Sequence, residues 1–303
     1  MKKHINFFIR NIITAGLVLA AMVSFAQSPE QAKLLEEAYN ENSTEILYQF
    51  FDRWSEEVKT NEKDAKNKYE VEAYKVFEAF YQPLQPEKVG WYNDSLYRDV
   101  PYLIVQSSLW RIYEVELILY KKAEIDSFCM ARLSQEMPGD TEGQKEQLER
   151  LRRLHCDGPH YSKDSYAPYL NVECTMIDTA VDFRPPVSFE GKKIVYITEE
   201  YKKLLDAFLG DEYIDYDMGH QAFAVKDSKD RQIFISQAAK IHYGHWGGYW
   251  QYETYPKASS IYFDKDMQRA IVSFRFIYSG GSVILEKQDG VWTIVDAKIT
   301  WVE

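Results

Sequence analysis

The fold is decided by the last part of the chain, residues 259–303, SSIYFDKDMQRAIVSFRFIYSGGSVILEKQDGVWTIVDAKITWVE. Apolar and polar residues alternate along this stretch, as is typical of strands that bury one face. Within Arg269–Ser279 one face is expected to carry Ala270, Val272, Phe274, Phe276 and Tyr278. Arg269, Ser273 and Arg275 are among the residues on the opposite face. The stretch therefore predicts antiparallel strands that cover a core.

Short turns are expected between four such strands. Lys265–Gln268 follows the first strand, Ser259–Asp264. Gly280-Gly281 and Asp289-Gly290 each offer the positive φ that a two-residue hairpin turn requires, and the second precedes a last strand over Val291–Val302. These are the strongest local signals in the chain, and they specify architecture more than function.

Upstream of this stretch the apolar spacing is partly helical. A first helix is predicted over Pro29–Asn40, and a second helix is expected to begin after a cap at Asn42, with Glu45 as the capping-box partner. Further helices are predicted over Tyr69–Phe80, from Thr141 to about Leu154, and over Glu199–Leu209 after a cap at Thr198. Strands are predicted at Tyr102–Ser107, Leu109–Tyr120, Ile125–Phe128 and Ile194–Ile197. Residues 155–190 lack periodicity and are expected to form a linker or a long irregular excursion.

Together these elements predict an α+β fold. N-terminal helices and strands are followed by a C-terminal curved antiparallel sheet packed on a helix. The expected division is a signal peptide at 1–26, an N-terminal helical and β region at 27–190, and a C-terminal α+β domain at 191–303.

The first 26 residues have the features of a secretory signal. Lys2, Lys3 and Arg10 are basic, Ile12–Val23 is apolar, and Ser24-Phe25-Ala26 is a small-x-small cleavage site. The mature protein is expected to be soluble, periplasmic or secreted, and to have no integral membrane segment after cleavage.

The charge of the chain disfavours two classes of partner. The formal charge of the full chain is −11, and cleavage removes three positive charges, which leaves −14. Nucleic acids and anionic membrane surfaces both require basic patches. The expected partner is therefore a small molecule, a glycan or a protein, with a homodimer through the sheet among the options.

The three cysteines, Cys129, Cys156 and Cys174, permit one disulfide in an oxidising compartment. Cys156 with Cys174 is the preferred pair because the two flank one turn-rich segment, but the two pairings that include Cys129 remain open. Cys129 has no neighbouring basic residue or recognisable motif, so it is expected to be a buried structural thiol.

The segment His242–Trp250, HYGHWGGYW, has the most unusual composition. Its glycines allow sharp turns beside large rings, which predicts a ligand-binding loop with His245, Trp246, Tyr249 and Trp250, and with Arg275 nearby. The alternative is a glycine-kinked strand whose rings close the core. A metal site is not expected, because residues three apart on a strand face opposite ways and no third ligand is evident.

The ending Gly-Val-Trp-Thr-Ile-Val-Asp-Ala-Lys-Ile-Thr-Trp, after a strand, a helix and a meander, resembles the cystatin-like cone of the nuclear transport factor two-like superfamily. The resemblance covers residues 192–303. Phe50–Trp54 and His245–Trp250 are also similar to segments of exported proteins of Bacteroidetes gut bacteria. The superfamily implies either isomerases and dehydratases or non-enzymatic binding domains. The His and Asp catalytic pair of some enzymatic members cannot be placed on this sequence.

Two functions therefore stand. The first is a non-enzymatic binding or interaction module with an aromatic pocket in its C-terminal domain. The second is a small-molecule or glycan hydrolase or isomerase that uses a carboxylate, with His242 or His245 as a candidate acid–base group. No hydrolase elbow, phosphate-binding loop, zinc motif or Cys-x-x-Cys is present, so no catalytic residue, metal or cofactor is predicted.

Overall fold

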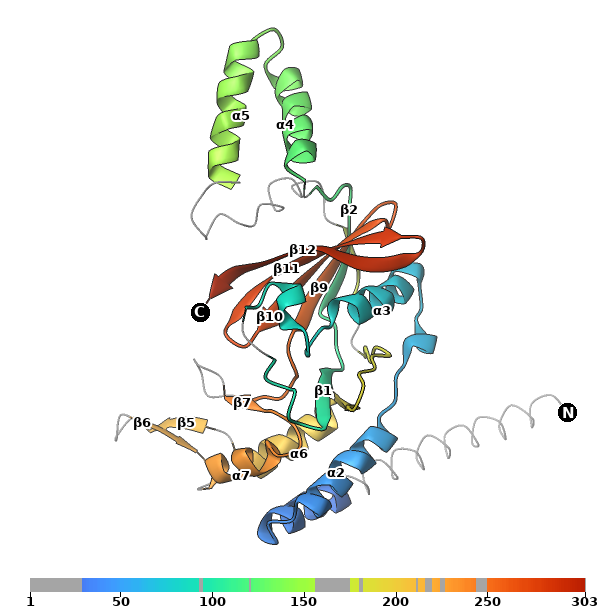
Figure 1. Cartoon of the computed structure of the whole chain (residues 1–303), viewed down its shortest axis with the longest axis vertical. Coiled ribbons are helices and arrows are strands. Elements are labelled where there is room, and N and C mark those ends of the chain that lie inside the picture. The colour runs from blue at the N-terminus through green and yellow to red at the C-terminus, as the bar shows by residue number, and fades with distance from the viewer. Residues whose placement is uncertain are drawn as a thin grey trace, which may run out of the picture. The chain divides into compact units, whose positions relative to one another are not determined.

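The structure is a computed structural model of the chain (Figure 1). It describes residues 29–92, 95–119, 121–155, 175–179, 182–210, 212–215, 220–223, 227–243 and 250–302. The predicted signal peptide, Cys156 and Cys174 lie outside the described residues. Crossing a membrane would take a longer apolar helix than any that the described part of the chain contains.

Contacts divide the described residues into two compact units, each assembled from three stretches of chain. Unit 1 draws on 1–58, 100–102 and 197–252, and unit 2 on 59–99, 103–196 and 253–303. The units interleave along the sequence and do not follow one another. The predicted boundary between residues 190 and 191 would divide the chain into two consecutive domains, and it stays a prediction.

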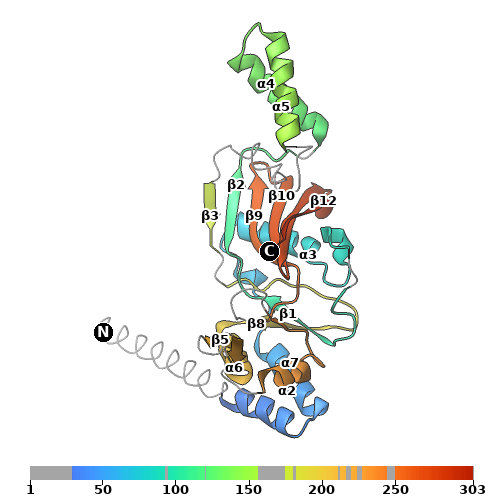
Figure 2. The same cartoon turned by 90° about the vertical axis from the view of Figure 1, so that its left-hand side faces the viewer.

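A six-stranded sheet lies at the centre of unit 2 (Figures 1 and 2). Its spatial order is β12 (Val291–Val302), β11 (Ser279–Gln288), β10 (Arg269–Phe276), β9 (Lys257–Asp264), β2 (Arg111–Val115) and β3 (Thr175–Asp178). Strands β9 to β12 form the predicted antiparallel meander, while β2 runs parallel to β9 and antiparallel to β3. Helices and sheets together confirm the α+β class. Strand β3 comes from the stretch that was expected to be irregular.

The turn between β10 and β11 lies at Ile277-Tyr278, so the predicted hairpin turn at Gly280-Gly281 is wrong. Ile277 has a φ of 55°, in the left-handed region. The two glycines lie inside β11, where β12 approaches closely. A Cβ on Gly280 would be 2.2 Å from the Trp301 ring, and one on Gly281 would be 1.9 Å from the Lys298 carbonyl oxygen. The glycines therefore serve strand packing and not a turn.

The next turn is confirmed, because Asp289 and Gly290 have φ values of 51° and 82°. The predicted buried face of β10 is also confirmed for Ala270, Val272, Phe274 and Phe276, which are 0–3% exposed. Tyr278 was expected on this face, but it lies in the turn and is 43% exposed.

Helix α3 (Lys68–Phe80) packs on this buried face, in contact with β2, β9, β11 and β12 (Figure 2). The Asn67 side chain caps it by accepting the backbone N–H groups of Tyr69 and Glu70 at 2.9 and 3.0 Å. The helix buries Ala73, Val76, Phe77 and Phe80. The sequence predicted this helix but assigned the sheet a different one, Glu199–Leu209, which belongs to unit 1.

Shorter elements complete unit 2. Two 3-10 helices, η1 (Glu62–Asp64) and η2 (Pro86–Val89), flank α3, and β1 (Tyr102–Gln106) pairs with β4 (Lys193–Ile197). The strand predicted over Leu109–Tyr120 is shorter in the structure, where β2 ends at Val115.

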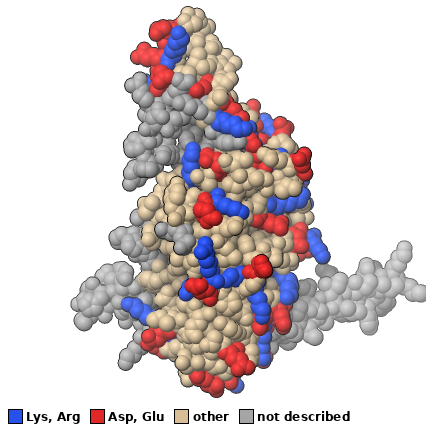
Figure 3. Space-filling model, viewed as in Figure 1, with Lys and Arg blue, Asp and Glu red and all other residues tan. Residues whose placement is uncertain are grey.

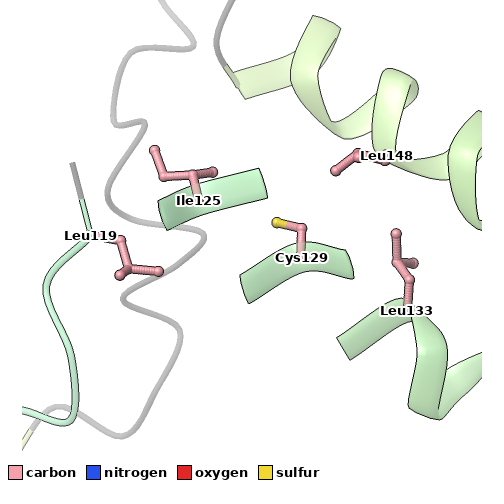
Figure 4. Packing of buried hydrophobic residues seen from close by; sticks show 5 residues of the cluster. All are labelled: Leu119, Ile125, Cys129, Leu133 and Leu148. Atoms are coloured by element: carbon pink, nitrogen blue, oxygen red, sulfur yellow. The ribbon is translucent and has the colours of Figure 1, made fainter. Parts of the chain in front are cut away.

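Helices α4 (Lys122–Glu136) and α5 (Thr141–His155) form a helical hairpin. The strand predicted at Ile125–Phe128 is wrong, because Ile125, Cys129 and Leu133 recur at helical spacing and pack against Leu148 (Figure 4). Cys129 is 4% exposed in this cluster, as expected of a structural thiol.

Unit 1 is mainly helical. A helix over 29–40 precedes α2 (Thr44–Glu57), followed later in the chain by α6 (Glu199–Leu209), α7 (Ser228–Ile235) and the hairpins β5–β6 (Glu212–Asp215, His220–Phe223) and β7–β8 (His242–Tyr243, Trp250–Gln251). Trp54 of α2 stacks on Tyr201 of α6 with ring centroids 4.2 Å apart. The α2 cap is Ser43, one residue beyond the predicted Asn42, because Asn42 has a φ of 49° and its neighbour accepts the Ile46 N–H.

Candidate functional site

Three of the five predicted ligand-binding residues, His245, Trp246 and Tyr249, lie outside the described residues. Trp250 is in β8 of unit 1 and is 6% exposed. Its indole Nε1 donates to the Gly210 carbonyl oxygen at 2.8 Å, and its ring meets Tyr243 edge-on at 5.1 Å. Trp250 thus packs in the interior of unit 1. The alternative interpretation of the segment, a strand whose rings close the core, predicts such packing.

Arg275 is in β10 of unit 2, on the sheet face opposite α3, as expected from its alternation with Phe274 and Phe276. Its Nε donates to the Ile277 carbonyl oxygen at 2.6 Å, and its guanidinium carbon lies 5.9 Å from the centre of the Trp301 ring. Trp250 and Arg275 belong to different units, and their expected proximity stays a prediction.

The face that carries Arg275 also holds a row of polar residues across five strands. Ser273 of β10 lies opposite Ser260 of β9 on one side and opposite Ser282 of β11 on the other. Ser260 is in turn next to Arg111 of β2, and Ser282 is next to Lys298 of β12. Residues directly opposite one another project from the same side of a sheet, with Cβ atoms about 5 Å apart. Three serines are therefore flanked by two cations, and we call these five residues the serine row.

A stack of rings and a guanidinium borders the serine row. Tyr113 and Tyr262 lie face to face, with centroids 4.7 Å apart and planes inclined by 9°. An Arg111 nitrogen donates to the Tyr113 hydroxyl at 3.1 Å, and the guanidinium carbon of Arg111 lies 4.7 Å from the Trp110 ring. Trp110 is 64% exposed. The sheet face thus offers an exposed aromatic surface beside the hydroxyls.

The serine row is buried or half-buried, and its hydroxyls have no hydrogen-bond partner within the described part of the chain. Ser260 is buried, and Ser273 and Ser282 are half-buried, yet none of the three hydroxyls hydrogen-bonds to another residue in the described part of the chain. Lys298 lies 3.5 Å from Asp296, whereas Arg111 has no carboxylate within ion-pairing distance among the described residues. In a strongly acidic chain, this group of donors is suited to an anion that also carries hydroxyl groups.

Two carboxyl groups of unit 2 with perturbed pKa values, Glu70 and Asp178, lie near the start of α3. Burial raises the pKa of Glu70, and the neighbouring Asp178 carboxyl raises it further, while hydrogen bonding with Glu70 lowers the pKa of Asp178. Glu70 Oε2 accepts the Lys66 N–H at 2.5 Å, so the group also caps the helix. Burial lowers the pKa of His242, which is in unit 1. No local pattern indicated the Glu70 and Asp178 pair, because the two residues come from distant parts of the chain.

A groove of about 670 Å³ lies between β12 and the segment around η2. It is lined by Gln82, Glu87, Lys88, Gly90 and Tyr92 on one side and by 292–297 of β12 on the other. Trp250 and Arg275, the two predicted ligand-binding residues that the structure describes, are not among its lining residues.

The chain has no counterpart in the three comparisons with known proteins. No protein-family model, no curated protein and no solved structure matches it.

Proposed function

We propose that this protein is a non-enzymatic binding module and that the serine row, with its aromatic border, is its ligand site. The observation that carries the proposal is the set of three serine hydroxyls, unbonded within the described residues, between Arg111 and Lys298 on one sheet face. A solvated sheet face also alternates in polarity, but it has no need of cations at both ends of a hydroxyl row or of an exposed Trp110 beside it.

The ligand class follows from the donors and acceptors on this face. Serine hydroxyls both donate and accept, so they suit the hydroxyl groups of a small polyol or a glycan. Guanidinium and ammonium groups suit a carboxylate, and the guanidinium suits it in a two-bond arrangement. The proposed ligand is an acidic sugar or a similar hydroxyl-bearing carboxylate. Arg275 lies on the same face and would provide a third cation.

The setting of this function rests on the sequence. The signal-like first 26 residues support a periplasmic or secreted location, and the acidic charge argues against nucleic acid as a partner. The antiparallel meander with one helix on its inner face and three register shifts is compatible with the proposed cystatin-like form. A homodimer through the sheet is part of the same proposal.

Calorimetric titration with matched sugars tests the proposal. Glucuronic and galacturonic acids should bind to the mature protein, whereas glucose and galactose should bind more weakly by about tenfold or more, the value of one charge-assisted hydrogen bond. Arg111→Ala with Lys298→Ala should abolish this preference. Lys145→Ala is the matched control, since Lys145 is on α5 and its side chain is 70% exposed. Equal affinity for acidic and neutral sugars, or no binding of either, would contradict the proposed ligand class.

A further inference from the structure

We propose that the groove beside β12 is a second binding surface, at which an extended polypeptide segment of a partner adds to the sheet as a further strand. This surface lies at the edge of the sheet, and Lys298 of the serine row directly follows its last β12 residue, Ala297. The proposal does not depend on what the serine row binds.

The edge of β12 has the hydrogen-bonding groups that this mode of binding uses. β12 pairs with β11 along its length, and among the described residues no strand pairs with its other edge. β12 has 12 residues, of which Asp296 and Lys298 are the charged ones. Long edges with few charges present rows of unpaired N–H and C=O groups, and an extended chain is the ligand that matches their spacing.

The groove lies along this edge, with β12 on one side and the segment around η2 on the other. Residues 292–297 would span roughly 20 Å at the rise of a regular strand, and they span less here because Val295 is an extra residue between the partners of Ile284 and Leu285. Ala79, Ile294 and Ala297 contribute apolar surface, while the charged lining residues are two acidic ones and one basic one, Glu87, Asp296 and Lys88. Alternate side chains of an added strand would meet these two kinds of surface. In Figure 3 acidic and basic side chains are intermingled over the visible face of the molecule.

The position of η2 favours binding of a single extended chain over pairing with the sheet of a second copy. Gly90, with a φ of 82°, ends η2 so close to β12 that a Cβ there would lie 3.3 Å from the Ala297 carbonyl oxygen. Register shifts between Ile284 and Leu285 and between Gly280 and Gly281 bend β12 further. Bulges of this kind discourage pairing between two flat sheet edges, whereas a lone flexible segment can follow the bend.

Tyr92 supplies an independent sign of a contact surface. It lines the groove and is 96% exposed, the highest value among the large apolar and aromatic side chains that are described as exposed. Tyrosine is enriched in the buried centres of interfaces, where its ring packs and its hydroxyl hydrogen-bonds. An added segment would cover this ring.

The test uses the mature full-length protein and a phage-displayed library of linear twelve-residue peptides. Synthetic copies of a selected peptide are then methylated at one backbone nitrogen at a time. We expect methylation at every second residue to weaken binding by tenfold or more and methylation at the residues between to change it less than threefold. Tyr92→Ala should weaken binding of the same peptide at least fivefold. Tyr278→Ala is the matched control, as an exposed tyrosine in a turn of the same sheet.

Each other outcome would overturn the proposal. These outcomes are a selection that yields no binding peptide, a methylation scan without the period of two, or a Tyr92→Ala variant that binds as the parent does. Concentration-dependent protection of β12 amides without peptide would assign the edge to a second copy. Arg111→Ala should leave peptide binding unchanged, which separates this result from the fate of the serine row.

Discussion

Ser273 and Ser282 lie directly opposite each other on β10 and β11, because the turn between these strands is at Ile277-Tyr278. The same register places Gly281 opposite Phe274. The position of this turn thus determines the register that pairs Ser273 with Ser282. The same register determines where a glycine must lie against β12.

Gly281→Ala should destabilise the protein by about 1–3 kcal/mol, the usual cost of forcing atoms into a packed site. The new Cβ would meet the Lys298 carbonyl oxygen, a backbone atom that cannot move without shifting β12. Ser282→Ala, at the next residue, should change the free energy of unfolding by less than about 0.5 kcal/mol, since its hydroxyl has no bond to lose. Urea unfolding measures both. Equal midpoints for the two variants would refute the close approach of β12.

Trp250→Ala should cost about 3–5 kcal/mol, as expected for a buried tryptophan. Trp250→Phe should cost less, because it keeps most of the packing but loses the hydrogen bond to the Gly210 carbonyl oxygen. Chemical denaturation of both variants checks the order. A loss below about 1 kcal/mol for Trp250→Ala would mean that the ring is not part of the core, and would restore it as a ligand contact.

Glu72 should make unit 2 sensitive to acid. Burial opposes its ionisation, but hydrogen bonds from Lys287, Lys75 and Trp292, at 2.7 to 2.9 Å, outweigh burial and lower its pKa. A lowered pKa stabilises the folded state above the unfolded value of about 4.5, and this stabilisation is lost as pH falls through the folded pKa.

The corresponding measurement is the thermal midpoint between pH 3 and pH 7 for the parent protein and for Glu72→Gln. The variant should be less stable at pH 7, and the difference should shrink below pH 4.5 or so. Glu146→Gln, on an exposed part of α5, serves as the control and should follow the parent throughout. A difference between Glu72→Gln and the parent that stays constant down to pH 3 would exclude this role for Glu72.

Local patterns predicted the period of β10 and the Asp289-Gly290 turn in unit 2, and the capped helix Glu199–Leu209 in unit 1. They failed where contacts with a distant segment determine the local structure. Two adjacent glycines resemble a hairpin turn, but here they make room for β12. Placing the turn at the glycines pairs Ser273 with Gln288, and this error concealed the serine row.

Other parts of the structure depend on contacts between segments that are separate in the sequence. Ile125 and Phe128 favour a strand, yet Leu148 of α5 packs against the helical face of the same segment. Glu70 and Asp178 come together only because β3 joins the sheet that α3 covers. Arg111 and Lys298 are similarly brought onto one sheet face from opposite ends of unit 2.

The serine row is proposed to bind a hydroxyl-bearing carboxylate. Backbone amide chemical shifts recorded during a titration with glucuronic acid test it most directly, with Ser273→Val and the exposed-loop control Ser188→Val measured alongside. We expect an affinity at least tenfold lower for Ser273→Val and unchanged for the exposed Ser188→Val. We expect the shifts to be concentrated at the five residues of the serine row, Arg111, Ser260, Ser273, Ser282 and Lys298. Saturable shifts that spare these five residues, or a Ser273→Val variant that binds as the parent does, would contradict it.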